Sequence, residues 1–136
     1  MPWKRLGRVW RAVGVERGRF VWKMPVSDLE ETLAWGLTHL APELKGWVRE
    51  FQAVPGRKFR HDFAFPDSRL LIEVQGGIYQ RGRSGHTGAS LASDYAKLNA
   101  ATCAGYRVLM FGPRDLSKRA LPETLDAIRA ALMAPR

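Results

Sequence analysis

A hairpin pattern in the middle of the chain constrains the fold most. Residues 57–65 and 69–75 are two strand-like segments, and Pro66-Asp67-Ser68 between them is a turn signal. The second segment contains Leu70-Leu71-Ile72-Glu73-Val74, an almost continuously apolar run that is typical of a covered central strand. The pattern therefore predicts a strand pair inside a sheet, with one charged residue in an apolar setting.

The segments around this hairpin predict an α/β domain. Ser27 and Glu30 form a capping-box pattern that opens a helix over 27–40, which Pro42 and Gly46 end. A further strand is expected at 47–54, a helix at 90–104, a strand at 106–111 and a closing helix at 122–133. The order arm, α, β, β, β, α, β, α predicts a mixed central β-sheet flanked by helices.

Basic residues gather at the N-terminus, in a chain of 136 residues whose net charge is +9. Residues 1–24 hold seven basic residues and one acid, so the chain divides into a basic arm, 1–25, and a domain, 26–136. The excess charge predicts an anionic partner. Helical spacing indicates an amphipathic helix in the arm, whereas 19–23 look extended; the stripe consists of Trp3, Leu6, Val9, Trp10 and Val13.

Several other classes of protein are excluded or disfavoured. The single cysteine, Cys103, excludes a disulfide framework and a multi-cysteine zinc site, and it fits a reducing cytosol. No apolar run reaches the roughly 20 residues of a membrane span, and the start lacks the apolar region of a secretory signal. For the arm, packing on the domain, a membrane-surface helix and a mitochondrial transit peptide stay open as alternatives.

Two carboxylates are predicted to face each other across the central hairpin. A turn centred on Asp67-Ser68 places Asp62 opposite Glu73, with Cβ atoms about 5 Å apart. Like charges at that distance are destabilising unless a cation binds between them, and Mg²⁺ prefers oxygen ligands. The same register pairs Arg60 with Gln75. The alternative is that both acids lie on a solvated sheet face.

These residues resemble the PD-(D/E)XK nuclease superfamily, and within it the archaeal-type Holliday junction resolvases and their phage relatives. The likeness is carried by residues 59–66, 71–77, 94–101 and 105–109, and it covers about 27–112. The resemblance implies a restriction-endonuclease-like αβββαβ core and metal-dependent hydrolysis of phosphodiester bonds. It also implies Mg²⁺ as the cofactor, for which Mn²⁺ can substitute.

The resemblance also assigns roles to individual residues. Asp62 and Glu73 match the two metal-binding acids, and Glu30 matches the helix acid, with Glu31 as the fallback. Gln75 stands where the family usually has lysine, so Arg60 and Lys97 are the cations expected to take over its charge. The expected catalytic set is thus Glu30, Arg60, Asp62, Glu73, Gln75 and Lys97.

The leading hypothesis is a structure-selective DNA endonuclease that cleaves four-way junctions in DNA recombination and repair. It acts as a homodimer in the cytoplasm of a bacterial or phage-infected cell, without membrane contact. The alternatives are a restriction-like or mismatch endonuclease, and a catalytically silent DNA-binding module. His61 is expected to pack on the phenylalanine side of its strand. Phosphate contacts are expected from Lys4, Arg5, Arg8, Arg11, Arg17, Arg19, Lys58, Arg81, Arg83 and His86.

Overall fold

A four-stranded mixed sheet forms the centre of the domain in the computed structural model, which describes residues 11–23, 29–76 and 88–135. Its strands, in spatial order, are β3 (Val48–Phe51), β4 (His61–Phe65), β5 (Leu70–Val74) and β6 (Arg107–Phe111). The β3–β4 and β4–β5 pairs are antiparallel, and β5–β6 is parallel. The predicted α/β class with a mixed sheet is confirmed.

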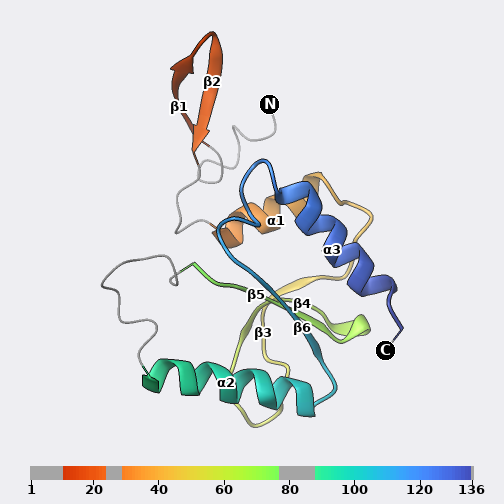
Figure 1. Ribbon diagram of the computed structural model, residues 1–136. Coiled ribbons are helices and arrows are strands. Elements are labelled where there is room, and N and C mark those ends of the chain that lie inside the picture. The colour runs from red at the N-terminus through yellow and green to blue at the C-terminus, as the bar shows by residue number, and fades with distance from the viewer. Residues whose placement is uncertain (1–10, 24–28, 77–87, 136) are drawn as a thin grey trace.

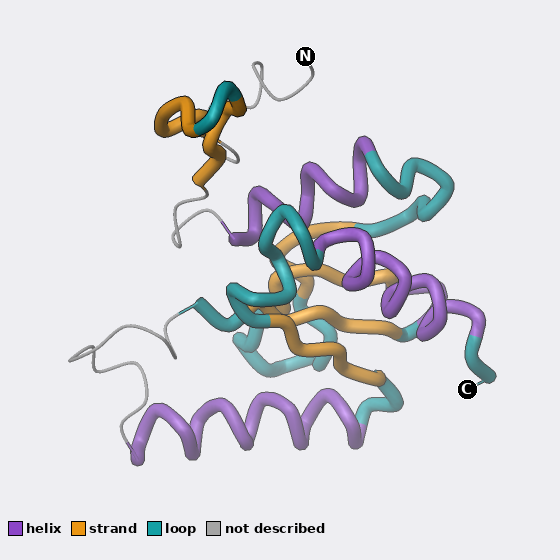
Figure 2. Tube along the Cα trace, turned by 45° about the horizontal axis from the view of Figure 1, so that its top comes forward, coloured by secondary structure: helices purple, strands orange, loops and turns teal. Residues whose placement is uncertain are grey.

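Helices cover both faces of this sheet. In Figures 1 and 2, α1 (Leu29–His39) and α3 (Leu121–Met133) lie over one face, and α2 (Gly88–Cys103) lies over the other. The chain passes through α2 between β5 and β6, which is the crossover that a parallel pair requires. Within the described residues, no helix has the length and apolarity needed to cross a membrane.

The core has two parts because side chains of β4 and β5 alternate between the two faces. Phe63 and Ile72 pack with α1 and α3 in the larger cluster. Ala64 and Leu71 pack with Ala101 of α2 in the smaller one. All are fully buried, and a buried phenylalanine, leucine or isoleucine side chain contributes about 1.5–3 kcal/mol. This packing fixes β4 and β5, the two strands that carry the predicted acids.

The central hairpin has the register that the turn predicted. Phe63 pairs with Ile72, Ala64 with Leu71, and Phe65 with Leu70. A short 3₁₀ turn, Pro66–Ser68, joins the strands, and Arg69 closes it with a φ of 49°. The strands are shorter than predicted, because the ladder ends at Phe63–Ile72 and does not extend to the acids.

A second, separate sheet replaces part of the predicted arm helix. β1 (Arg11–Glu16) and β2 (Arg19–Lys23) pair with each other as an antiparallel hairpin, which stands apart from the main sheet in Figure 1. Arg17 and Gly18, with φ of 50° and 76°, form the two-residue turn that such hairpins favour. The predicted helix is therefore wrong for residues 11–13, whereas the predicted extended conformation of residues 19–23 is confirmed. Residues 1–10 lie outside the described part of the chain.

Candidate metal centre

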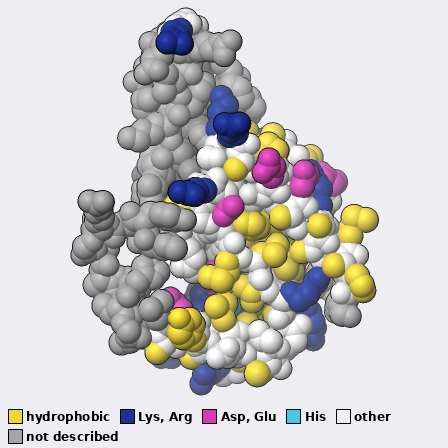
Figure 3. Space-filling model, in the orientation of Figure 1, with side chains coloured by type: hydrophobic (Ala, Val, Ile, Leu, Met, Phe, Trp, Pro, Cys, Tyr) yellow, Lys and Arg dark blue, Asp and Glu magenta, His cyan; other side chains and the backbone are white. Residues whose placement is uncertain are grey.

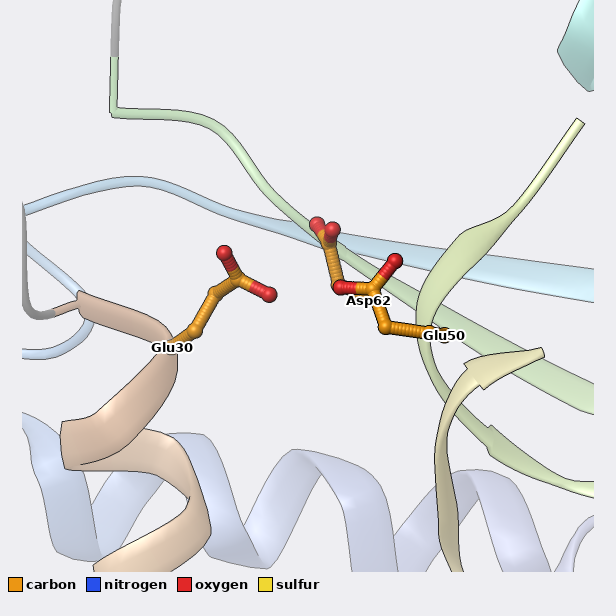
Figure 4. A group of neighbouring side chains, drawn as sticks. All are labelled: Glu30, Glu50 and Asp62. Atoms are coloured by element: carbon orange, nitrogen blue, oxygen red, sulfur yellow. The ribbon is translucent and has the colours of Figure 1, made fainter.

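Three carboxylates converge from three different elements of the fold. Glu30 lies in the first turn of α1, Glu50 on β3 and Asp62 on β4, and their side chains point toward one another in Figure 4. One oxygen of each lies within 4.8 Å of the other two. Although 40% of the Glu30 side chain is exposed, its Oε1 is buried and has no hydrogen-bond partner among the described residues.

Glu50, which the sequence analysis did not select, reaches the site through the β3–β4 register. Arg49 pairs with Phe63 and Phe51 pairs with His61, so Glu50 lies opposite Asp62. Its φ of 51° is the left-handed conformation, which costs a residue with a Cβ roughly 1–2 kcal/mol. No turn motif predicts this register, because the connection from 52 to 60 is too long for turn chemistry to set it.

Asp62 lies where the β4–β5 ladder opens. The backbone N–H of Val74 donates to Asp62 Oδ2 at 2.7 Å, one step beyond the last paired residues. In addition to burial, the nearby charge of Glu73 raises the pKa of Asp62. The predicted proximity of the two acids is therefore present, but it arises at the end of the ladder and not from a paired position within it.

The acids on this side have raised pKa values. Burial raises the pKa of Asp62 to about 7, with further increases from the charges of Glu73 and Glu30, although the Val74 N–H opposes them. Burial, followed by the charge of Glu50, also raises the pKa of Glu30. Burial and the neighbouring carboxylates thus disfavour the charged forms of both acids, and a divalent cation is a group that would reverse this.

Glu73 is surrounded in the opposite way. Its Oε1 lies 2.6 Å from Nδ1 of His61 and 2.8 Å from Nζ of Lys97, and only 6% of its side chain is exposed. Burial works to raise the pKa of Glu73, but the hydrogen bonds from His61 and Lys97 outweigh it and lower that pKa. Lys97 is thus a predicted site residue that the structure places next to Glu73.

His61 is fully buried at the start of β4. Its Nδ1 contacts the same Glu73 oxygen as Lys97 of α2. Nε2 of His61 has no hydrogen-bond partner among the described residues.

Arg49 contacts both neighbouring helix acids, and its closer contact is with Glu31. Arg49 Nη1 lies 2.7 Å from Glu31 Oε1, and its Nη2 lies 3.8 Å from Glu30 Oε1. Glu31 is thus held at the exposed rim in an ion pair. Glu30 is the acid that joins Asp62 in the cluster.

The predicted Arg60–Gln75 pair is wrong. Arg60 is exposed and precedes β4, and Gln75 follows β5, so neither lies in the β4–β5 ladder. The backbone N–H of Gln75 instead donates to the carbonyl of Phe111 at 2.8 Å, which continues the pairing of β5 with β6. The β4–β5 ladder therefore does not bring Arg60 beside Gln75.

The predicted phosphate-binding residues are spread over several segments. Arg11 and Arg19 lie on the N-terminal hairpin, and Arg17 is exposed at its turn. Lys58 is exposed in the connection between β3 and β4. Six of the predicted residues fall outside the described part of the chain: Lys4, Arg5, Arg8, Arg81, Arg83 and His86.

Comparisons with known proteins add no relative to this picture. Searches against protein-family models, curated proteins and solved structures gave no match to this chain. The functional argument therefore rests on the arrangement of Glu30, Glu50, Asp62 and Glu73 and on the chemistry that such an arrangement allows.

Proposed function

We propose that this protein is a Mg²⁺-dependent DNA endonuclease of the PD-(D/E)XK superfamily that cleaves branched DNA, with four-way junctions as its main substrate. The observation that carries the proposal is the convergence of Glu30, Glu50 and Asp62 beside the buried Glu73. The order α1-β3-β4-β5-α2-β6 also agrees with the αβββαβ core that the sequence resemblance implies.

The residues present fit a hard divalent cation. Glu30, Glu50 and Asp62 offer only carboxylate oxygens, which suit Mg²⁺ and Mn²⁺. The buried Glu30 Oε1 lacks a hydrogen bond within the described residues, so this oxygen is available as a ligand. When bound, such an ion activates water and offsets the charge that develops on a phosphate under attack.

Other residues of the chain prepare the acids for this task. His61 and Lys97 both hold Oε1 of Glu73, which fixes the orientation of that carboxylate and leaves Oε2 as its remaining oxygen. The Lys97 ammonium also brings a positive charge next to the acids, which the family usually obtains from a lysine at the position of Gln75. Asp62 has to release its proton before it can bind a cation, because its pKa is about 7.

A junction-cleaving enzyme of this size needs two copies of the chain. Two matched cuts on a two-fold symmetric substrate require two active sites, and one chain supplies one site, so we propose a homodimer. Figure 3 shows apolar side chains gathered over the region of β6 and α3. This apolar region is the proposed contact, and the exposed large apolar side chains of the two elements include Met110 of β6, 49% exposed, and Met133 of α3, 86% exposed.

Two other functions of the same fold remain as alternatives. A catalytically silent DNA-binding module is favoured by Gln75 in place of the lysine and by the two donors that already occupy Glu73 Oε1. A restriction-like or mismatch endonuclease has the same acids and differs only in its substrate.

A cleavage assay separates these functions. Labelled four-way junction, flap, duplex and single-stranded DNA are each incubated with the protein in Mg²⁺ or in EDTA. The proposal predicts paired, symmetric nicks in the junction, in Mg²⁺ only, and a dimeric mass in solution. Equal nicking of junction and duplex by a monomer would favour the restriction-like alternative. Binding without cleavage of any substrate would favour the silent module.

A further inference from the structure

The connection between β3 and β4 contains a short basic segment, residues 57–60, which we call the basic loop. It reads Arg-Lys-Phe-Arg, and the whole connection from 52 to 60 contains no acid. Arg57, Lys58 and Arg60 are exposed. None of the three forms an ion pair with a carboxylate in the described part of the chain, whereas Arg49 and Arg129 both do.

The basic loop is held in place by its own contacts. Gln52 Nε2 donates to the carbonyl of Arg57, and the Arg57 N–H donates to the carbonyl of Val54 at 3.2 Å. Ala53 is buried in the smaller core cluster, which anchors the start of the connection. The Arg57 guanidinium lies 5.1 Å from the centre of the Phe59 ring. The cations are therefore presented from an ordered surface.

The basic loop leads directly into the acidic site. Arg60 is separated from Asp62 only by the buried His61. Lys58 and Arg60 alternate in sequence with Phe59, against which Arg57 is stacked. Because a chain spans at most about 3.3–3.6 Å per residue, Lys58 and Arg60 are separated along the chain by no more than roughly 7 Å, as are Arg60 and Asp62.

A regular polyanion matches this arrangement better than a membrane does. Cations at alternate positions suit a backbone that repeats a negative charge at short, regular intervals. Phe59 is only partly exposed and already lies against Arg57, so the basic loop offers no free apolar group for insertion into lipid.

We propose that the basic loop binds the phosphate backbone of duplex DNA and leads it toward the acidic site, an inference that rests on the proposed nuclease function. Lys58 and Arg60 contact consecutive phosphates of one strand, and Arg57 contacts the duplex from its stacked position on Phe59. Arg60 is thereby a substrate-binding residue and not a substitute for the lysine missing at Gln75. The contact is to phosphate, so it adds affinity for DNA of any sequence.

The test compares a Lys58→Gln/Arg60→Gln variant of the full chain with a Lys45→Gln/Arg119→Gln control, which removes the same charge from exposed residues outside the basic loop. Binding of labelled duplex and junction DNA is measured in EDTA over a salt series. The loop variant is expected to bind at least tenfold more weakly, and the slope of log K against log[salt] should fall by about 2, at ~0.9 per phosphate contact. Both variants should keep the wild-type unfolding temperature.

Several results would overturn the inference. They are an unchanged affinity and salt slope in the loop variant, an equal loss in the control, and binding of anionic lipid vesicles but not of DNA. Because binding in EDTA needs no catalysis, failure of the proposed function appears separately, as wild-type binding without cleavage in Mg²⁺. A loop variant that loses DNA affinity in such a protein would still place the DNA on the basic loop.

Discussion

The acidic site consists of two halves in which the pKa values of the carboxyl groups are shifted in opposite directions. In the compensated half, Glu73 is bonded to His61 and Lys97, and its pKa is lowered. In the uncompensated half, formed by Glu30, Glu50 and Asp62, the pKa of Asp62 is raised to about 7. Burial alone does not explain the difference, since it acts to raise the pKa on both sides. What differs is how close the positive groups lie: Glu73 Oε1 has His61 at 2.6 Å and Lys97 at 2.8 Å, whereas Glu30 has, among the described residues, only the Arg49 guanidinium at 3.8 Å.

This contrast assigns different tasks to the two halves. A carboxylate held by two donors on one oxygen is fixed in place before any ligand arrives. A group of three carboxylates whose nearest cation among the described residues is one guanidinium at 3.8 Å gains most when a divalent ion binds. The account therefore predicts that the uncompensated half binds the ion and the compensated half orients Glu73.

The largest effect is expected for Asp62, which belongs to the uncompensated half and whose pKa is raised by burial and by the charge of Glu73. Asp62→Asn should lower Mg²⁺-dependent cleavage by at least 10²–10³-fold, because it removes a ligand charge at the reacting centre. DNA binding should stay or tighten, since a negative charge that repels phosphate is lost. Single-turnover cleavage and binding in EDTA measure the two effects, with Glu31→Gln as the control. Cleavage at the wild-type rate would remove Asp62 from the site.

In the compensated half, Lys97→Met should reduce both cleavage and stability. It leaves the buried Glu73 with one donor fewer, which should cost about 1–3 kcal/mol of unfolding free energy and 10–100-fold in cleavage. Denaturant unfolding and cleavage rates check this, with the exposed Lys45→Met as the matched control. A variant that loses neither would show that Lys97 does not support Glu73.

His61 tests whether orientation of Glu73 matters apart from charge. In His61→Asn, the side-chain amide lies near the position of Nδ1 and can still donate to Glu73, whereas His61→Leu keeps the bulk without the donor. The leucine variant should lose roughly tenfold in kcat with little change in KM, and the asparagine variant should recover most of that loss. Equal activity of the two variants would mean that His61 only fills space.

Substitution of Glu50 should have a smaller effect, and it should act on stability and on metal affinity in different ways. Glu50→Gly removes a side chain from a left-handed position, so the strain at a φ of 51° disappears. The variant should be as stable as the wild type or more stable, by up to ~1 kcal/mol, and should bind Mn²⁺ about tenfold more weakly. Glu50→Gln, which keeps the strain, should lose metal affinity alone. Unchanged Mn²⁺ affinity in both variants would exclude Glu50 as a ligand.

The smallest effect is a pH dependence of stability in EDTA. Between the ordinary carboxyl pKa of 3.8 and about 7, folded Asp62 keeps a proton that the unfolded chain releases. The unfolding free energy should therefore fall as pH rises through this range, by on the order of 1 kcal/mol after allowance for solvent screening. Asp62→Asn should show a flatter profile, and Mg²⁺ should restore stability at pH 8 more than at pH 5. Parallel profiles for the two proteins would contradict the raised pKa.

Sequence reasoning reached the parts of this site that local patterns determine. The Pro66-Asp67-Ser68 turn determines the central register, and the apolar run around Glu73 determines a covered strand. Glu50 was missed because its place depends on the register of two strands joined by a long connection. The predicted Arg60–Gln75 pair is wrong because the β4–β5 ladder ends before Asp62. There, a hydrogen bond from the Val74 N–H to the Asp62 side chain takes the place of backbone pairing.

The arm shows a different limit of sequence patterns. Apolar residues at helical spacing suggested a helix through Val13, but the Arg17-Gly18 turn closes a hairpin over that region. A two-residue turn with glycine between β-branched and aromatic residues was the signal that the spacing obscured.

Direct binding of Mn²⁺ tests the central claim, that the uncompensated half holds a divalent cation. Titration calorimetry at pH 8, without DNA, compares the wild type with Asp62→Asn, Glu50→Gln and the neighbouring Glu31→Gln. The account predicts saturable Mn²⁺ binding by the wild type and by Glu31→Gln, and at least tenfold weaker binding by the two cluster variants. No binding by the wild type, or equal binding by all four proteins, would contradict it.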